Sequence, residues 1–298
     1  MVPPIAIGCA ELGSMPDAFA YTVSEEDALA TVRAFLASPL NYIDTAASYN
    51  DGESERRIGM VLRELGGLPD GAILQTKAGC DRIAKDYSRD TVQRRFERSL
   101  SLLGVDKVHT CFLHDAEQTT FAHTMTKGSV VDLLLDYKRQ GIIGNIGVAS
   151  GPVDLSLQYV ETGVFDCVIT HNRYTLLDRS ADPVQQEAKR RGMTVLNAAP
   201  YGSGILAKGP DAYPRYSYRE APAEFVATAR RIQELCAQYG VPMAAAALQF
   251  SLRDPNVDVT IVGMSKPERV QQTIDLATYA IPENLWAELD TLPTYTLP

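Results

Sequence analysis

The sequence predicts a (β/α)8 barrel, and three observations support this fold class. Short apolar runs rich in β-branched residues alternate with longer amphipathic segments along most of the 298 residues. Eight such runs occur, which in a chain of this length is the repeat number of the barrel. The glycine motif G-x-G-x-x-G, which an open doubly wound sheet usually carries after its first strand, is absent. The barrel is therefore favoured over the open sheet.

The predicted strands are continuous apolar runs, which indicates a parallel sheet covered on both faces. They span residues 4–8, 42–46, 72–78, 108–114, 145–150, 166–172, 194–199 and 259–263.

The predicted helices have apolar residues at helical spacing, and several end in glycine. They span residues 24–38, 54–65, 91–104, 130–141, 153–163 and 182–192. The longest irregular segment, residues 201–222, follows the seventh strand and is a candidate lid or pocket wall. No linker or low-complexity tract divides the chain, so we expect one barrel domain over residues 1–298.

The composition of the chain limits the kinds of molecule that it is expected to bind. A net charge of −9 and a pI near 5.0 argue against nucleic acid or an anionic membrane, so a small-molecule substrate is expected. The five cysteines form no C-x-x-C pair, so we expect reduced thiols and no metal site. Without a basic leader or a run of about 18 apolar residues, a cytoplasmic protein is expected. Both a monomer and a small homo-oligomer remain open.

Four ionisable side chains lie at or just after the ends of three predicted strands: Asp44 and Tyr49, Lys77, and His114. Each has an ordinary structural explanation, such as a cap, a rim aromatic, a solvated charge or a core histidine. Catalytic groups of a barrel sit at the carboxyl ends of its strands, so these four residues converge on one rim. Their joint placement favours a catalytic site.

The chemistry that suits this set is proton transfer at an oxygen atom. A tyrosine, with a pKa near ~10, needs neighbours to act as acid or base at neutral pH. We expect Lys77 to lower the pKa of Tyr49, Asp44 to hold the ammonium, and His114 to donate a hydrogen bond to the substrate. A proton-transferring tyrosine indicates carbonyl–alcohol interconversion, whose hydride requires a nicotinamide cofactor.

At these residues the sequence resembles the aldo-keto reductase superfamily over essentially its whole length. The family pattern D-T-A-x-x-Y followed by G-x-S-E is matched by DTAASYNDGESE, its catalytic lysine by Lys77 and its catalytic histidine by His114. The resemblance implies catalytic roles for Asp44, Tyr49, Lys77 and His114, and NAD or NADP as the cofactor.

The resemblance also implies a cofactor site on the later strands. Ser150 would bind the nicotinamide carboxamide beside Gly151, where the family usually has asparagine, and His171 stands where it often has glutamine. Residues 262–270 look like the adenosine-phosphate loop, with Arg269 as its arginine or, alternatively, a helix-surface charge. The full set expected at the cofactor is Asp44, Ser150, Gly151, His171, Ala199, Tyr201, Gly202, Gly204, Gly263, Ser265, Lys266 and Arg269.

Two departures from the family pattern concern the cofactor. Ala198 aligns with the tyrosine that stacks on nicotinamide in many NADPH-dependent reductases, and Tyr201 is a possible replacement. Gly263 and Met264 align with a lysine and a serine, which removes a charge that would meet a 2′-phosphate. Because Ser265, Lys266 and Arg269 can still supply such contacts, NAD and NADP both remain open.

Within the superfamily, residues 171–181 and 197–206 are most similar to the aldose 1-dehydrogenase branch. This likeness implies oxidation of a cyclic hemiacetal to a lactone, with Tyr49, His114, Asn172 and Arg173 as substrate-binding residues. A buried ion pair is an equally good explanation of Arg173. The alternatives are a broad NADPH-dependent aldehyde or ketone reductase, and a non-catalytic nicotinamide-binding barrel.

Overall fold

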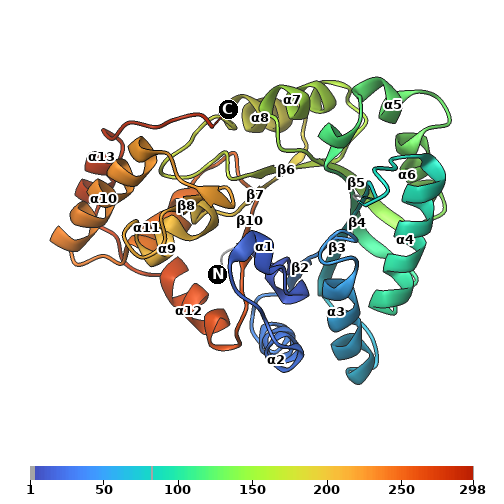
Figure 1. Ribbon diagram of the computed structural model, residues 1–298, viewed down its shortest axis with the longest axis horizontal. Coiled ribbons are helices and arrows are strands. Elements are labelled where there is room, and N and C mark those ends of the chain that lie inside the picture. The colour runs from blue at the N-terminus through green and yellow to red at the C-terminus, as the bar shows by residue number, and fades with distance from the viewer. Residues whose placement is uncertain (1–3, 82, 298) are drawn as a thin grey trace.

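The computed structural model describes residues 4–81 and 83–297, in which parallel strands close into a barrel within a ring of helices (Figure 1). The barrel strands are β1 Ile5–Gly8, β2 Tyr42–Asp44, β3 Ile73–Gly79, β4 Val108–His114, β5 Ile143–Ala149, β6 Cys167–His171, β7 Thr194–Ala198 and β10 Val259–Gly263. Around the barrel they follow the order β1, β10, β7, β6, β5, β4, β3, β2, and β2 pairs with β1. The predicted barrel is confirmed, and each strand lies within two residues of its predicted limits.

Helices surround most of the barrel (Figure 1). They are α1 Pro16–Phe19, α2 Glu25–Leu36, α3 Glu53–Glu64, α4 Arg89–Leu103, α5 Phe121–Met125, α6 Val130–Arg139, α7 Val153–Glu161, α8 Asp182–Arg190, α9 Ile205–Lys208, α10 Ala223–Gln238, α11 Met243–Leu252, α12 Glu268–Ala277 and α13 Glu283–Leu289. The six predicted helices correspond to α2, α3, α4, α6, α7 and α8. Residues 1–3, 82 and 298 of the predicted domain lie outside the described residues.

Local sequence explains several helix ends. The hydroxyls of Ser24 and Ser88 accept hydrogen bonds from the amides of Asp27 and Thr91, and so cap α2 and α4. Helix α4 ends at Gly104, whose φ of 71° lies in the left-handed region that glycine adopts at little cost.

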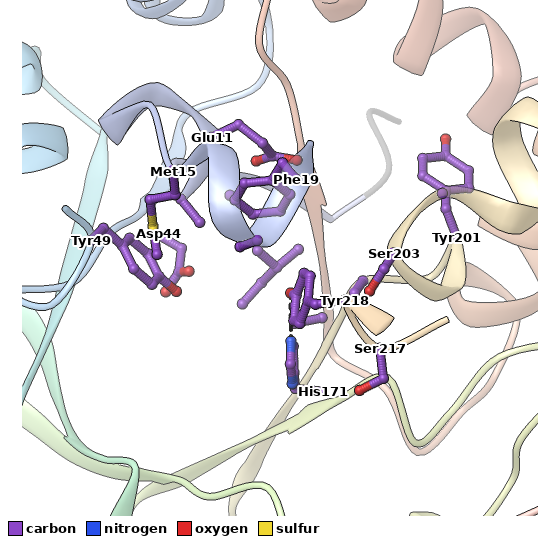
Figure 2. Close-up of a pocket in the computed structure, with 18 of the residues that line it drawn as sticks. Glu11, Met15, Phe19, Asp44, Tyr49, His171, Tyr201, Ser203, Ser217 and Tyr218 are labelled. Carbon is purple, nitrogen blue, oxygen red and sulfur yellow. Dashed lines mark hydrogen bonds between the residues drawn. The ribbon is translucent and has the colours of Figure 1, made fainter. Parts of the chain in front are cut away.

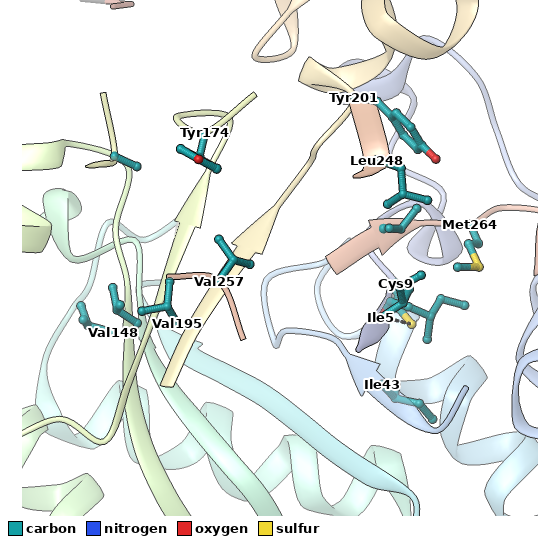
Figure 3. Packing of buried hydrophobic residues seen from close by; sticks show 14 of the residues in the cluster. Ile5, Cys9, Ile43, Val148, Tyr174, Val195, Tyr201, Leu248, Val257 and Met264 are labelled. Atoms are coloured by element: carbon teal, nitrogen blue, oxygen red, sulfur yellow. Dashed lines mark hydrogen bonds between the residues drawn. The ribbon is translucent and has the colours of Figure 1, made fainter. Parts of the chain in front are cut away.

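Buried apolar residues form two clusters, and Figure 3 shows part of the larger one. Side chains alternate along each strand between the interior of the barrel and the surrounding helices. The smaller cluster gathers strand residues and includes Phe112, Leu196 and Ile261. Gly147 leaves room for Phe112, because a Cβ atom there would lie 2.4 Å from its ring. These side chains pack the interior of the barrel.

Strand β2 ends two residues earlier than predicted, and the chain beyond it still runs beside β3. The amides of Thr45 and Ala47 donate to the carbonyls of Gln75 and Lys77, at 3.2 and 3.1 Å. The amide of Tyr49 then donates to the carbonyl of Ala46 at 3.1 Å. This turn carries Tyr49 to the mouth of the barrel.

The start of α3 ties three strands together. The Ser54 hydroxyl donates to the carbonyl of Cys9, after β1, and lies 2.9 Å from the Thr45 hydroxyl, after β2. The Glu55 carboxylate accepts a hydrogen bond from Thr76 of β3 at 2.5 Å. Ser54 and Glu55 are both buried. The sequence GESE is therefore more than a helix start, because it fixes the strands that carry Asp44 and Lys77.

The segment 201–222 contains regular structure that the sequence did not predict. It holds the 3-10 turn Gly202–Gly204, helix α9, and a hairpin of β8 Arg215–Tyr216 with β9 Arg219–Glu220. Ser217 and Tyr218 form the hairpin turn with φ values of 50° and 65°. The prediction of an irregular loop is therefore wrong, since two short strands and a helix turn give the segment a defined shape.

Two other expectations can be compared with the described residues. Their five cysteines are free and buried, as expected for reduced thiols. No helix in residues 4–81 and 83–297 has the length and apolar character needed to cross a bilayer.

Helix α3 is held against α4 at Gly59, and this contact is testable. A Cβ atom at residue 59 would lie 1.9 Å from the carbonyl oxygen of Leu102. We expect Gly59→Ala to lower the free energy of unfolding by roughly 1–3 kcal/mol, because backbone must move to admit the methyl group. Urea denaturation measures the change. The exposed substitution Gln271→Ala on α12 is the control and should cost less than about 0.5 kcal/mol; equal effects would contradict the close packing.

Candidate active site

A cavity of about 670 Å³ opens at the carboxyl ends of the barrel strands. A volume of this size is typical of small-molecule and cofactor sites. Asp44, Tyr49, Lys77 and His114 all line it, and so does the loop that follows β10. Figure 2 shows Asp44 and Tyr49 on one side of this cavity and His171 and Tyr218 on another. The four side chains from the strand ends therefore do meet at one place.

The Lys77 ammonium has a hydrogen-bond acceptor for each of its protons. It donates to Asp44 Oδ2 at 2.7 Å, to the carbonyl of Thr45 at 2.9 Å and to the hydroxyl of Tyr49 at 3.0 Å. Asp44 and Lys77 are each only 3% exposed. The Asp44 carboxylate also accepts a hydrogen bond from Gln75 at 2.6 Å. All three ammonium protons thus have an acceptor, which a buried charge requires.

The contact with Lys77 determines whether the Tyr49 hydroxyl donates or accepts in this hydrogen bond. An ammonium group can only donate, so the Tyr49 oxygen accepts from Lys77 and its own proton is directed elsewhere. Burial, and next the negative charge of Asp44, raise the pKa of Tyr49 well above its ordinary value. The expectation that Lys77 gives a lowered pKa is therefore wrong for the net shift. At physiological pH Tyr49 is therefore a neutral phenol that still carries its hydroxyl proton.

His114 lies beside Tyr49 with its ring edge-on. The two ring centroids are 6.0 Å apart and the planes meet at 84°. His114 Nδ1 is 3.3 Å from the Ser48 hydroxyl, and Nε2 is 3.5 Å from Asp115 Oδ1. These contacts hold the His114 imidazole on the cavity wall. A ligand group beside the Tyr49 hydroxyl could reach this imidazole as well.

His171, at the end of β6, is paired with Tyr218 of the hairpin turn. The Tyr218 hydroxyl lies 2.7 Å from His171 Nε2, and the Asn172 amide nitrogen lies 3.1 Å from the same atom. Both groups can donate, so Nε2 is the acceptor and the ring is neutral. Burial lowers the pKa of His171 to about 4, in agreement with a neutral ring. Figure 2 shows the two side chains end to end in the cavity.

Two segments bridge the mouth of the cavity. The Tyr213 hydroxyl donates to the carbonyl of Phe19 at 3.2 Å, and the Phe19 ring meets Tyr218 edge-on at 5.5 Å. The Lys208 ammonium lies over the Tyr213 ring, 4.0 Å from its centroid. The segment after β1 and the segment 201–222 together therefore form one wall of the site.

The end of the cavity near β10 is basic. Lys208, Lys266 and Arg269 line it together with Ser265. Tyr201 also lines this cavity, and its hydroxyl is buried and has no hydrogen-bond partner among the described residues. Cations, hydroxyl donors and an unused buried hydroxyl are a donor set suited to phosphate groups.

Most residues predicted for cofactor or substrate line the cavity, and three do not. Those that line it are Asp44, Tyr49, Lys77, His114, Ser150, Gly151, His171, Ala199, Tyr201, Gly204, Gly263, Ser265, Lys266 and Arg269. Gly202 lies outside the lining and packs on Tyr216, whose ring would be 2.4 Å from a Cβ atom at residue 202. It is a packing position.

Asn172 and Arg173, which the sequence predicts as substrate-binding residues, also lie outside the lining and make other contacts. Asn172 has a φ of 55°, is buried, and uses its amide on His171 and Ser203. The Arg173 guanidinium donates to the carbonyl of Leu297 and lies 4.0 Å from the buried carboxylate of Asp178. The alternative of a buried ion pair is therefore the better explanation of Arg173.

Two acidic residues of the lining were missed from the sequence. Glu11 follows β1, and Glu117 follows β4. Glu117 accepts hydrogen bonds from the Ser150 hydroxyl at 3.1 Å and from the Gly151 amide at 3.4 Å. Each of the two carboxylates lies where a glycine, Gly263 or Gly151, has left space. The signal in the sequence that could have identified Glu11 and Glu117 is an acidic residue shortly after a predicted strand.

Comparison with known proteins agrees with the geometry of the site. The model of the aldo/keto reductase family matches residues 4–293. The chain belongs to the aldo/keto reductase family. It is an NAD(P)-dependent oxidoreductase, since this family uses nicotinamide cofactors.

Relatives extend over nearly all of this aldo/keto reductase. Pyridoxal 4-dehydrogenase of Microbacterium luteolum is 30% identical, over 97% of this chain and 93% of its own. D-threo-aldose 1-dehydrogenase of a Pseudomonas species is 28% identical over the same shares. A solved aldo-keto reductase of Bacillus halodurans, in its holo form, has a TM-score of 0.77 at 20% identity, covering 99% of this chain and 94% of that one.

The buried Asp44–Lys77 pair makes a prediction about stability. We expect Lys77→Met to lower the free energy of unfolding by about 3–5 kcal/mol, because it leaves the Asp44 carboxylate buried without its cation. The double variant Asp44→Asn/Lys77→Met should lose less than the sum of the single changes. Chemical denaturation of all three variants measures this coupling.

The matched control is an exposed ion pair between Arg33 and Glu64. Arg33→Met should cost no more than about 1 kcal/mol, because solvent screens this pair. A loss on Lys77→Met no larger than that on Arg33→Met would contradict a buried, structurally required charge pair.

Proposed function

We propose that this enzyme oxidises the cyclic hemiacetal of a sugar or sugar-like molecule to a lactone, with Tyr49 as the proton-transferring residue. The observation that carries the proposal is the Lys77–Tyr49 contact of 3.0 Å, which leaves the Tyr49 proton available to the cavity. Two relatives support the substrate class, since their names describe a pyridoxal dehydrogenase and an aldose dehydrogenase.

The cavity has residues suited to both ends of a nicotinamide dinucleotide. We assign Ser150 and His171 to the nicotinamide end, near the catalytic group, and Ser265, Lys266 and Arg269 to the phosphates. The unpartnered Tyr201 hydroxyl is a further donor at this basic end. When bound, the cofactor accepts or supplies the hydride, a reaction that amino-acid side chains do not perform.

Each catalytic residue has a separate task. In the reducing direction, Tyr49 gives its proton to the carbonyl oxygen of the substrate, and in the oxidising direction its phenolate takes the hydroxyl proton. Lys77 holds the Tyr49 oxygen and stabilises the negative charge of the phenolate. Asp44 holds Lys77, and His114 orients the substrate oxygen.

A second candidate function is the reduction of aldehydes or ketones of broad specificity with NADPH. The raised pKa of Tyr49, caused first by burial, favours this direction, because a neutral phenol is the proton donor that reduction needs. A non-catalytic nicotinamide-binding barrel is disfavoured, since binding alone does not require a proton donor held by a buried ion pair.

A substrate panel separates the first two functions. We expect absorbance of the reduced nicotinamide to grow with an aldose or pyridoxal and one of the oxidised cofactors. Reduction of simple aldehydes, with no oxidation of any aldose or of pyridoxal, would contradict the dehydrogenase assignment and favour the reductase.

The remaining expectations from the sequence are part of the same proposal. We propose one barrel domain, a small-molecule substrate without nucleic acid, and a cytoplasmic location. The choice between a monomer and a small homo-oligomer stays open.

Tyr49→Phe tests the acid–base assignment. Because it removes only the hydroxyl, turnover should fall by about 10²–10⁴-fold while cofactor affinity stays within about twofold. Initial rates and fluorescence titration of the reduced cofactor measure the two quantities. Tyr279→Phe, at a half-exposed tyrosine outside the cavity, should retain full turnover. Undiminished turnover of Tyr49→Phe would remove Tyr49 from the acid–base role.

The raised pKa of Tyr49 also predicts how the two directions depend on pH. Oxidation needs the phenolate, whose fraction rises with pH as long as the pH stays below the raised pKa. The oxidation rate at saturating substrate should therefore increase between pH 7 and pH 10, by up to about tenfold per unit, while reduction should not. An oxidation rate that falls with pH over this range, with the enzyme still folded, would exclude Tyr49 as its base.

A further inference from the structure

The Glu11 side chain lies across the end of β10, inside the cavity. Glu11 begins the 3-10 turn Glu11–Gly13 that follows β1, and β1 pairs with β10 so that Gly8 faces Gly263. A Cβ atom at residue 263 would lie 2.1 Å from Glu11 Oε1. No side chain other than that of glycine fits there without moving the carboxylate. Figure 2 shows Glu11 among the lining residues, beside Phe19.

The position of Glu11 places a negative charge at the basic end of the site. Ser265, Lys266 and Arg269 follow Gly263 along the chain and line the same cavity, and Lys208 approaches from α9. The backbone amide of Glu11 interacts with the carboxylate of the same residue. Among the other described residues, none is seen to donate a hydrogen bond to this carboxylate or to form an ion pair with it. No other described side chain therefore neutralises the Glu11 carboxylate in an ion pair, and it is available to a ligand in the cavity.

We propose that Glu11 is a specificity-determining residue that shifts the cofactor preference of this enzyme toward NAD(H) and away from NADP(H). The inference rests on the proposed function, in which a nicotinamide dinucleotide occupies this cavity with its phosphates at the basic end. The two bridging phosphates are common to both cofactors and meet Glu11 alike. Only NADP carries a third phosphate, and repulsion between this group and the carboxylate acts on NADP alone.

The neighbouring cations act in the opposite direction to Glu11. Lys208, Lys266 and Arg269 attract the phosphates of both cofactors, including the third phosphate of NADP, so without Glu11 the site would favour NADP more strongly. Glu11 opposes the additional charge, and a carboxylate can also accept hydrogen bonds from ribose hydroxyls, as acidic residues do in other NAD sites. Gly263 is the companion of Glu11, because its missing side chain is what admits the carboxylate.

Glu11→Gln tests the proposal, since it removes the charge and keeps the shape. The readout is the dissociation constant of NADPH divided by that of NADH, from fluorescence titration at pH 8.5. We expect this ratio to fall by about tenfold or more in Glu11→Gln. The control is Glu268→Gln, at an exposed residue beside Arg269 that does not line the cavity, and its ratio should stay within about twofold of the unchanged protein.

Repeating the same titrations at pH 6 gives a second test of the role of Glu11. Burial raises the pKa of Glu11 to about 7, so the carboxylate is mainly neutral at pH 6 and charged at pH 8.5. The preference for NADH in the unchanged protein should therefore grow with pH more than in Glu11→Gln, where only the cofactor phosphate titrates. The ionisable groups that interact with Glu11 are Cys9, Tyr21, Tyr49, Lys208, Tyr218 and Arg269.

The outcomes distinguish this inference from the function on which it rests. If both cofactors bind and Glu11→Gln leaves their ratio unchanged at pH 8.5, Glu11 has no part in selection and the inference is overturned. If neither cofactor binds the unchanged protein, the proposed function is contradicted, and the inference with it.

Discussion

The site depends on one buried ammonium group. Lys77 carries a positive charge into the mouth of the barrel, where a charge is stable only if every donor finds an acceptor. The carboxylate of Asp44, a carbonyl after β2 and the Tyr49 hydroxyl are those acceptors. This requirement fixes β2 against β3, explains why the chain after β2 must turn back toward Lys77, and leaves the Tyr49 proton pointing to the substrate side.

Helix α3 and the segments at the mouth of the barrel hold Asp44, Lys77 and Tyr49 in place. Ser54 and Glu55 at the start of α3 link the ends of β1, β2 and β3, and Gly59 brings α3 close to α4. Above the strands, Phe19 meets Tyr213 and Tyr218 of the segment 201–222. These contacts hold the two segments together beside the site, and burial of Tyr49 raises the pKa of its hydroxyl.

Sequence reasoning predicted the barrel and the convergence of Asp44, Tyr49, Lys77 and His114, because strand ends of a parallel barrel share one rim. It failed where the direction of a side chain depends on local backbone or distant packing. Asn172 adopts a positive φ and turns to His171, while Arg173 finds its partner at Leu297, 124 residues along the chain. Neither fact has a signal in the local sequence.

Two further errors have a related physical origin. The pKa of Tyr49 was expected to fall because only the charge of Lys77 was considered, whereas burial has the larger effect and raises it. Glu11 and Glu117 were missed because each occupies space left by a glycine on another strand end, a pairing visible only in three dimensions.

The central claim is that proton transfer at Tyr49 accompanies hydride transfer between substrate and nicotinamide. An aldose deuterated at its anomeric carbon tests it most directly, with mass spectrometry of the reduced cofactor after turnover. We expect one deuterium in the reduced nicotinamide, formed by the unchanged enzyme and not by Tyr49→Phe. Turnover of the sugar that releases the deuterium to solvent, or equal transfer by Tyr49→Phe, would contradict it.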